Sequence, residues 1–211
     1  GEADLGLVPV AVIPQLGEEA TVISDYCIGT LGAVKTVCIY SQVPIEEVTE
    51  LYLDYHSRTS VALTRYLLAD RWGTQPRLLP AKPGYEQRLK GSTAGLIIGD
   101  RTIGLDDQYA HIYGLGEIWR AHTGLPFVFA AWVSRKPLPA AFMEAFNRAL
   151  GQGVQQRHQV AQLFESSHPD FSVHEYYHRY IDYALTPEKR QALALFLAQV
   201  RQQPQLALQR G

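Results

Sequence analysis

Short apolar segments alternate with helical patterns along the first part of the chain, and this alternation constrains the fold more than any other sequence feature. The segments typical of strands are rich in Val, Ile, Leu, Tyr and Phe: Leu5–Val10, Thr21–Ile28, Val34–Tyr40, Leu51–Tyr55, Arg77–Pro80, Ala94–Ile98 and Pro126–Val133. The helical patterns between them are Ile45–Glu50, Ser60–Arg71, Tyr85–Lys90 and Leu115–Thr123. Elements in this order predict an α/β protein with mixed or parallel sheets.

After Val133 the pattern is helical only. Amphipathic helices are predicted over Pro139–Gly151, Val154–Ser166, Val173–Leu185 and Pro187–Gln202. The strands form two groups, and the chain returns from the second group to a last long strand, which predicts two lobes joined by crossing segments. Residues 1–40 would form part of the first lobe, residues 41–125 the second, and residues 126–211 the return strand and C-terminal helices of the first. Small ligands commonly bind in the cleft between such lobes.

Charge and apolar patterning indicate which partners the chain can bind, and its cysteines indicate the redox compartment. The 211 residues carry a formal net charge of −2, and the 19 Lys and Arg residues form no stripe, so no nucleic-acid partner is expected. No apolar run approaches the roughly 20 residues of a membrane-spanning helix, so no membrane partner is expected either. Cys27 and Cys38 lie in strand-like segments, which favours buried free thiols in a reducing compartment; a disulfide between them is the alternative.

The motif Ser57–Arg58–Thr59–Ser60 lies between an apolar strand and the helix that follows it. The first turn of a helix has free backbone N–H groups and the positive end of the helix dipole, and Arg58 adds a cation. The motif therefore predicts a site for a carboxylate or phosphate. The alternative is a plain capped helix whose hydroxyls bind only their own backbone.

A second candidate is Ile98–Gly99–Asp100, where an apolar strand ends. Glycine lets the backbone turn sharply or approach a ligand, and Asp100 offers a carboxylate at the carboxyl end of the strand. A tight turn with Asp100 bonded to its own backbone is the alternative. The neighbouring set Asp54, His56 and Ser57 has the letters of a catalytic triad, but these residues are too close in sequence to converge as a triad does.

His174–Glu175–Tyr176–Tyr177–His178 matches the zinc motif H-E-x-x-H. The overlapping pattern from Ser172 to Glu175 is also a capping box, in which the serine caps the helix and the glutamate bonds back to the serine N–H. No third ligand follows at a recognisable spacing, so we interpret both histidines as helix-surface residues and expect no metal. The nearby tyrosines are interpreted as a packed face.

Five stretches, taken in order, resemble the menaquinone-biosynthesis enzymes of the futalosine pathway. They are Gly1–Pro9, Ser57–Leu63, Leu96–Asp100, Leu115–Trp119 and Thr123–Ala130. Each motif is short, but their combined order is specific and extends over essentially the whole chain. Within the family, the last stretch and the serine-rich motif resemble the chorismate dehydratase side more than the cyclic dehypoxanthinyl futalosine lyase side.

The resemblance implies a two-lobed fold like that of type II periplasmic binding proteins, used for catalysis in the cytoplasm. The family has an additional N-terminal strand–helix–strand region that this chain lacks, so the first lobe is expected to be incomplete. We expect little or no activity from this chain alone, and restored activity when roughly 50 to 70 residues precede it. Gly114 also stands where family members commonly have an acidic residue.

The implied activity is dehydration of chorismate, a small dicarboxylate, to 3-[(1-carboxyvinyl)oxy]benzoate without a cofactor or metal. Asp100 is the candidate catalytic base; the alternatives are a base in the N-terminal region that this chain lacks and a base on the substrate itself. The candidate substrate-binding residues are Pro9, Ser57, Arg58, Thr59, Ser60, Ile98 and Gly99. Two other functions remain open: the related lyase, and a solute-binding protein for a small carboxylate.

Overall fold

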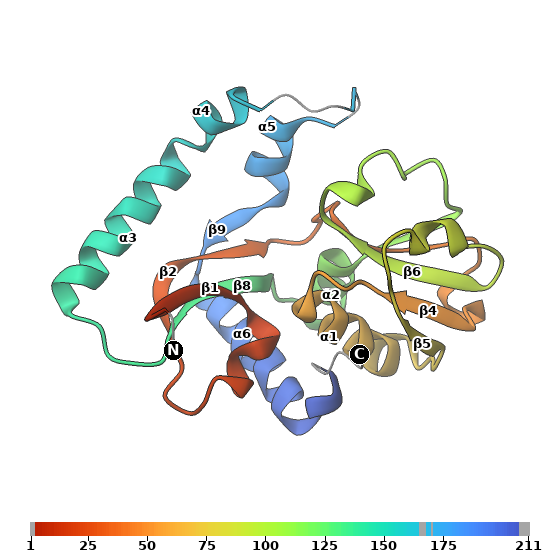
Figure 1. Cartoon of the computed structure of the whole chain (residues 1–211), viewed down its shortest axis with the longest axis horizontal. Coiled ribbons are helices and arrows are strands. Elements are labelled where there is room, and N and C mark those ends of the chain that lie inside the picture. Colours follow the sequence, from red (N-terminus) through yellow and green to blue (C-terminus); the bar gives the residue numbers. More distant parts are fainter. Residues whose placement is uncertain (1–2, 165–167, 170, 207–211) are drawn as a thin grey trace.

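The computed structural model describes residues 3–164, 168–169 and 171–206, and two β-sheets organise them (Figure 1). The first sheet has the strand order β1-β8-β2-β9 and its pairings are antiparallel: β1 (Leu5–Pro9), β8 (Phe127–Ser134), β2 (Thr21–Thr30) and β9 (Asp182–Ala184). The prediction of an α/β protein is confirmed.

The second sheet is mixed and has the order β5-β4-β6-β3-β7. Its strands are β5 (Arg77–Pro80), β4 (Glu50–Leu53), β6 (Thr93–Ile98), β3 (Val37–Ser41) and β7 (His111–Gly114). Strand β4 pairs in parallel with β5 and β6, whereas β3 pairs antiparallel with β6 and β7. Because β4 and β6 run the same way, the loops that leave their carboxyl ends emerge side by side.

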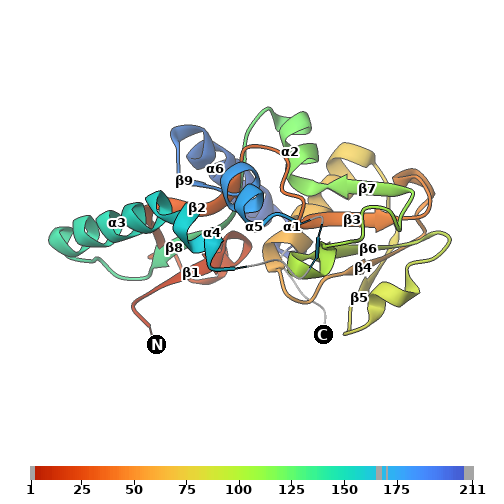
Figure 2. The ribbon, with the colours of Figure 1, turned by 90° about the horizontal axis from the view of Figure 1, so that it is seen from above.

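Six α-helices are described: α1 (Arg58–Leu67), α2 (Leu115–Thr123), α3 (Ala140–Gln155), α4 (Arg157–Gln162), α5 (Val173–Glu175) and α6 (Pro187–Gln202). The chain passes from the first sheet to the second through residues 31–36, and it returns through α2. Figure 2 shows the two sheets side by side along the long axis, with α1, α2 and α6 near the junction. The division into lobes with boundaries at residues 40 and 125 stays a prediction.

One hydrophobic core extends across the junction. Leu63 and Leu67 of α1 are fully buried in the same cluster as Val10, which follows β1, and Phe127 of β8. The Phe127 ring lies 5.1 Å, between centroids, from the rings of both Trp119 in α2 and Phe196 in α6. These helices therefore pack against β8 through edge-to-face aromatic contacts.

The prediction of one helix over Val173–Leu185 is wrong. The segment begins as α5, continues as a π-turn over Tyr176–Tyr180, and ends as strand β9. The fully buried Lys189 at the start of α6 forms an ion pair with Asp182 and donates to the Ala184 carbonyl at 2.9 Å. Pairing with β2 and these contacts from α6 hold β9 extended, so tertiary contacts override the helical spacing.

Other predicted boundaries also change. Ile45–Glu47 and Tyr85–Arg88 form single 3-10 turns rather than helices, because Glu50 already belongs to β4 and Leu89 leaves the helical conformation. Helix α3 continues past Gly151, and part of the predicted helix Val154–Ser166 lies outside the described residues. Strand β7 was not predicted, because four residues at a sheet edge give too short a pattern.

Both cysteines are free and buried, so the alternative of a disulfide is wrong. Cys27 lies in β2 of the first sheet and Cys38 in β3 of the second. Burial raises the pKa of the Cys27 thiol to about 11 and that of the Cys38 thiol to about 12. Both side chains therefore remain protonated at neutral pH and act as small apolar groups.

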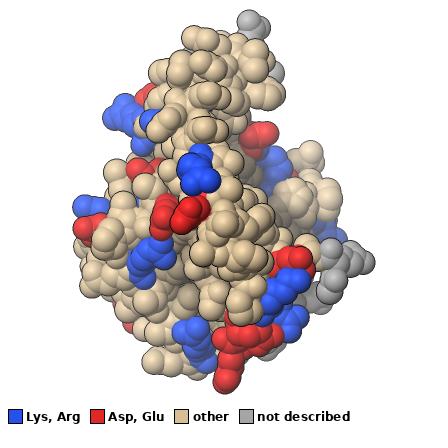
Figure 3. Space-filling view, turned by 90° about the vertical axis from the view of Figure 1, so that its left-hand side faces the viewer, with Lys and Arg blue, Asp and Glu red and all other residues tan. Residues whose placement is uncertain are grey.

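Lys, Arg, Asp and Glu side chains are interspersed on the face shown in Figure 3. Within the described part of the chain, no helix is long and apolar enough to cross a membrane.

Thr59 connects α1 to the first sheet. Its hydroxyl is fully buried, donates to the Phe129 carbonyl at 2.9 Å and accepts from the Ala11 N–H at 3.3 Å. The hydroxyl of Thr64, in the same helix, is also buried but has no hydrogen-bond partner among the described residues. The two threonines form a matched pair that differs in hydrogen bonding.

We predict that Thr59→Val lowers the free energy of unfolding by about 2 kcal/mol, because it leaves a buried N–H and a buried carbonyl unpaired. Thr64→Val should be neutral or stabilising, since it removes a buried hydroxyl that already lacks a partner. Urea unfolding of both variants measures the difference. Equal losses would contradict a bridging role for Thr59.

Candidate functional site

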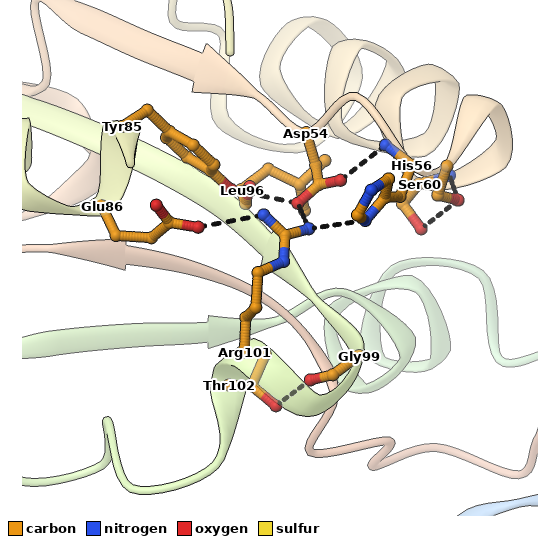
Figure 4. Close-up of polar contacts among 10 residues, drawn as sticks. Asp54, His56, Ser60, Tyr85, Glu86, Leu96, Gly99, Arg101 and Thr102 are labelled. Atoms are coloured by element: carbon orange, nitrogen blue, oxygen red, sulfur yellow. Dashed lines mark hydrogen bonds and ion pairs between the residues drawn. The ribbon is translucent and has the colours of Figure 1, made fainter. Parts of the chain in front are cut away.

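The candidate site lies at the carboxyl ends of β4 and β6. After β4, residues 54–57 lead into α1; after β6, the chain forms a 3-10 turn over Gly99–Thr102. Figure 4 shows the polar side chains that meet there. Ligands commonly bind at the carboxyl ends of neighbouring parallel strands, because loops and helix N-termini gather at that edge.

Asp54 forms the buried centre of this group, with 1% of its surface exposed. Its Oδ1 accepts from the His56 N–H at 2.7 Å, and its Oδ2 lies 3.0 Å from the Tyr85 hydroxyl and forms an ion pair with Arg101. Burial and the nearby Asp54 charge raise the pKa of Tyr85, so its hydroxyl stays protonated and can donate. The buried carboxylate is thus satisfied on both oxygens.

Arg101 joins three elements. Besides Asp54, its guanidinium binds Glu86 at 2.9 Å and lies 5.1 Å from the centre of the Tyr55 ring. Partial burial disfavours the charged form, but Asp54, Tyr85 and Glu86 together outweigh it, and the pKa of Arg101 is raised. Because two carboxylates already neutralise this cation, Arg101 fixes the site rather than offering a free charge to a ligand.

The geometry determines the tautomer of His56. Its Nδ1 lies 3.2 Å from Nη2 of Arg101, and arginine can only donate, so Nδ1 must accept. In this arrangement the imidazole is neutral and carries its proton on Nε2. His56 therefore presents a donor rather than a base on its exposed side.

At the start of α1, Ser57 has extended backbone angles and acts as the N-cap. Its Oγ accepts from the Ser60 N–H at 3.1 Å and donates to Ser60 Oγ at 2.8 Å. The capping alternative therefore describes this serine. Among the described residues, no acceptor faces the backbone N–H groups of Arg58 and Thr59, and the Arg58 side chain is exposed. These two N–H groups and the Arg58 cation are the donors left for an anion.

The first sheet also contacts the start of α1. Pro9 ends β1, and two residues later the Ala11 N–H bonds the hydroxyl of Thr59. The Thr59 hydroxyl is used in this contact and in the bond to Phe129, so it positions the helix start and is not free for a ligand. Pro9 and the serine-rich motif thus lie in neighbouring elements, as one site would require.

On the other side, Ile98 ends β6, and Gly99 and Asp100 begin the turn that follows it. Gly99 has a φ of 66°, a left-handed conformation that favours glycine, and its N–H donates to the Thr36 carbonyl at 2.9 Å. The Thr36 hydroxyl lies 2.8 Å from the Tyr176 hydroxyl. Burial raises the pKa of Tyr176, and the negative charge of the exposed Asp100 adds to this effect. The turn that carries Asp100 and the Tyr176 hydroxyl thus both contact Thr36.

The H-E-x-x-H motif lies in α5 and the π-turn that follows it. Ser172 Oγ accepts from the Glu175 N–H at 3.1 Å, but Glu175 pairs with Arg179 at 3.0 Å instead of returning to Ser172, so only half of the predicted capping box forms. The rings of His174 and His178 stack at 4.1 Å. Among the described residues, no group of three or more His, Cys, Asp or Glu side chains could hold a metal ion.

Sequence reasoning missed Arg101, Glu86 and Tyr85 as members of this site. They come from two different turns, and only the pairing of β4 with β6 and the packing of the 3-10 turn bring them to Asp54. The one available signal was a carboxylate directly after an apolar strand, which needs a partner when it is buried.

A family model described as menaquinone biosynthesis matches residues 1–202. The chain belongs to this menaquinone biosynthesis family. A curated member from Thermus thermophilus named chorismate dehydratase is 28% identical over 181 residues. That alignment covers 77% of this chain and 66% of the Thermus enzyme, so the chain spans slightly less than two thirds of that relative. The resemblance found in the sequence motifs is confirmed at the level of the family.

Two solved structures have a fold similar to that of this chain. A protein from Archaeoglobus fulgidus matches with a TM-score of 0.67 and 13% identity, covering 97% of this chain and 80% of that one. An ABC transporter from Parabacteroides distasonis matches with a TM-score of 0.58 and 18% identity, covering 98% and 77%. At these identities the likeness concerns the fold alone, and it agrees with the expected periplasmic-binding-like architecture.

We predict that Arg101→Met lowers the free energy of unfolding by about 3 kcal/mol, because it leaves the buried Asp54 carboxylate without its cation. The double variant Asp54→Asn, Arg101→Met should lose less than Arg101→Met alone, since no buried charge then remains unpaired. Urea unfolding of both variants tests the pairing. A double variant less stable than the single one would show that the two side chains act independently.

Proposed function

We propose that the protein is a chorismate dehydratase, which removes water from chorismate to form 3-[(1-carboxyvinyl)oxy]benzoate. The observation that carries the proposal is the start of α1, beside the ends of β4 and β6: the backbone N–H groups of Arg58 and Thr59 have no acceptor among the described residues, and the Arg58 side chain is exposed. Membership of the menaquinone biosynthesis family and the relative named chorismate dehydratase support this choice of substrate.

The chemistry fits a site of this kind. Chorismate has two carboxylates, and loss of its ring hydroxyl with a neighbouring proton makes the ring aromatic, so no cofactor is needed for the driving force. As the proton leaves, negative charge spreads through the ring alkene toward the ring carboxylate. Donors placed on that carboxylate stabilise the transition state more than the ground state. We assign this role to the first turn of α1 and to Arg58.

Binding of the rest of the substrate is assigned to Pro9, which ends β1, and to Ile98 and Gly99 at the end of β6. Asp100 is the candidate general base, because its exposed carboxylate follows β6 directly. His56 is not assigned this role, because its Nδ1 faces the Arg101 guanidinium, and Glu86 is already paired with Arg101.

The main competing function is binding of a small carboxylate at the start of α1 without reaction. The related futalosine lyase is the other. The protein at its full natural length is incubated with chorismate, and substrate loss and the benzoate-type absorbance of the product are followed. Turnover supports the dehydratase. Saturable binding of chorismate without turnover would overturn it in favour of a binding protein.

We predict that Arg58→Gln lowers kcat/KM for chorismate at least about tenfold, since a charge-assisted hydrogen bond is worth about 1.5 to 3 kcal/mol. Arg71→Gln, which removes an equally exposed cation beyond the end of α1, is the control and should stay within about twofold. Arg58 is preferred to Ser57 for this test because Ser57 also caps the helix. Equal kcat/KM values for the two variants would show that the start of α1 is not part of the substrate site.

We further predict that Asp100→Asn lowers kcat by a factor of about 100 or more and changes KM little, as expected for loss of a general base. The variant should fold normally, because the Asp100 side chain is exposed. Steady-state kinetics measure the split between kcat and KM. Retained kcat would assign proton removal to another group.

A further inference from the structure

A second concave surface lies away from the ends of β4 and β6, where α3, α4, the π-turn and β9 meet. It has a volume of about 370 Å³ and is lined by residues from all four elements. Its walls are mainly apolar, formed by Leu150, Val154 and the rings of Tyr177 and Tyr183. Figure 1 shows α3 and α4 on the opposite side of the molecule from β4 and β6. Volumes of this order are typical of small-molecule sites.

The polar groups in this concavity are donors. Arg157, at the start of α4, is half-buried, and its Nη1 donates to the Val154 carbonyl at 2.8 Å. It takes part in none of the ion pairs among the described residues. Burial raises the pKa of Tyr183 to about 12 although the Arg157 charge lowers it, so the phenol is protonated at neutral pH. Among the described residues that line the concavity, none carries a carboxylate.

Two glycines in α3 differ in a way that points to the same surface. A Cβ on Gly151 would come within 2.5 Å of the Tyr26 hydroxyl, so close packing explains this glycine. A Cβ on Gly153 would meet nothing within 4 Å, yet glycine in a helix interior costs about 1 kcal/mol relative to alanine. Gly153 lines the concavity, and the missing side chain leaves that space open.

We propose that this concavity binds a small amphipathic anion, a flat apolar body with one carboxylate or sulfonate group. The apolar body lies against Leu150, Val154 and the two tyrosine rings, and the anionic group lies at Arg157 with the Tyr183 hydroxyl as a further donor. This site is separate from the proposed dehydratase site and shares none of its residues. The charge of Arg157 and the apolar wall argue together for this ligand class.

The test uses two fluorescent probes, anilinonaphthalene sulfonate, which carries an anionic group, and N-phenylnaphthylamine, which does not. Gly153→Leu should fill the concavity and weaken both probes at least about tenfold. Gly153→Ala is the matched control; it keeps most of the space, stabilises the helix, and should bind both probes within about threefold of the original protein.

Arg157→Gln separates charge from shape. It should weaken the sulfonate probe about tenfold and leave the neutral probe unchanged, whereas Arg148→Gln, which removes an exposed cation of α3, should change neither. Circular dichroism verifies the fold of each variant. Sulfonate binding unaffected by either Gly153→Leu or Arg157→Gln would overturn the proposal.

Sedimentation of the protein without probe tests whether a second copy of the chain fills the concavity. A dimer that becomes monomeric on Gly153→Leu would mean that a second copy fills the concavity, and this also overturns the proposal. Excess chorismate should leave probe binding unchanged. If the protein does not turn over chorismate, the probe-binding result still stands. Each of the two proposals can therefore be refuted without the other.

Discussion

The position of α1 depends on one buried hydroxyl. Thr59 donates to β8 and accepts from the segment after β1, while the rest of α1 packs in the core that both sheets share. A helix that follows β4 of the second sheet is thereby attached to the first sheet. Its N-terminus, the end of β1 and the ends of β4 and β6 consequently meet at one place. A movement of one sheet relative to the other would break this hydrogen bond or move the helix start with it.

Electrostatics then fix the local geometry of the site. The buried Asp54 carboxylate needs a cation, and Arg101 supplies it from the turn after β6 while also binding Glu86. Asp54 and Glu86 neutralise the charge of Arg101. The exposed cation beside the first turn of α1 is therefore Arg58. Arg101, labelled in Figure 4, thus organises the site, whereas Arg58 is exposed and forms no ion pair among the described residues. This division of roles follows from burial and pairing.

Much of the fold could be predicted because the signals were local. Most strands and the helices α1, α2 and α6 follow from apolar periodicity and from caps such as Ser57 and Thr186. The helix prediction is wrong for residues 176–184. The tyrosines there have helical spacing, but contacts with β2 and Lys189 hold the end of the segment extended. For the site, local sequence found the loop that begins α1 and the turn after β6. It could not find Arg101, because the partner of Asp54 lies 47 positions away in sequence.

The sequence by itself determined the class of fold, the capped helix after β4 and, through the order of its motifs, the family. Each depends on residues close together in the chain, where propensity, caps and periodicity act. Only the tertiary structure decided which hydroxyls and cations remain available. Thr59 is used between the sheets and Arg101 is neutralised, whereas the N–H groups of Arg58 and Thr59 have no acceptor among the described residues and the Arg58 side chain is exposed. The physical reason is that availability depends on burial and on partners distant in sequence, and folding alone brings those together.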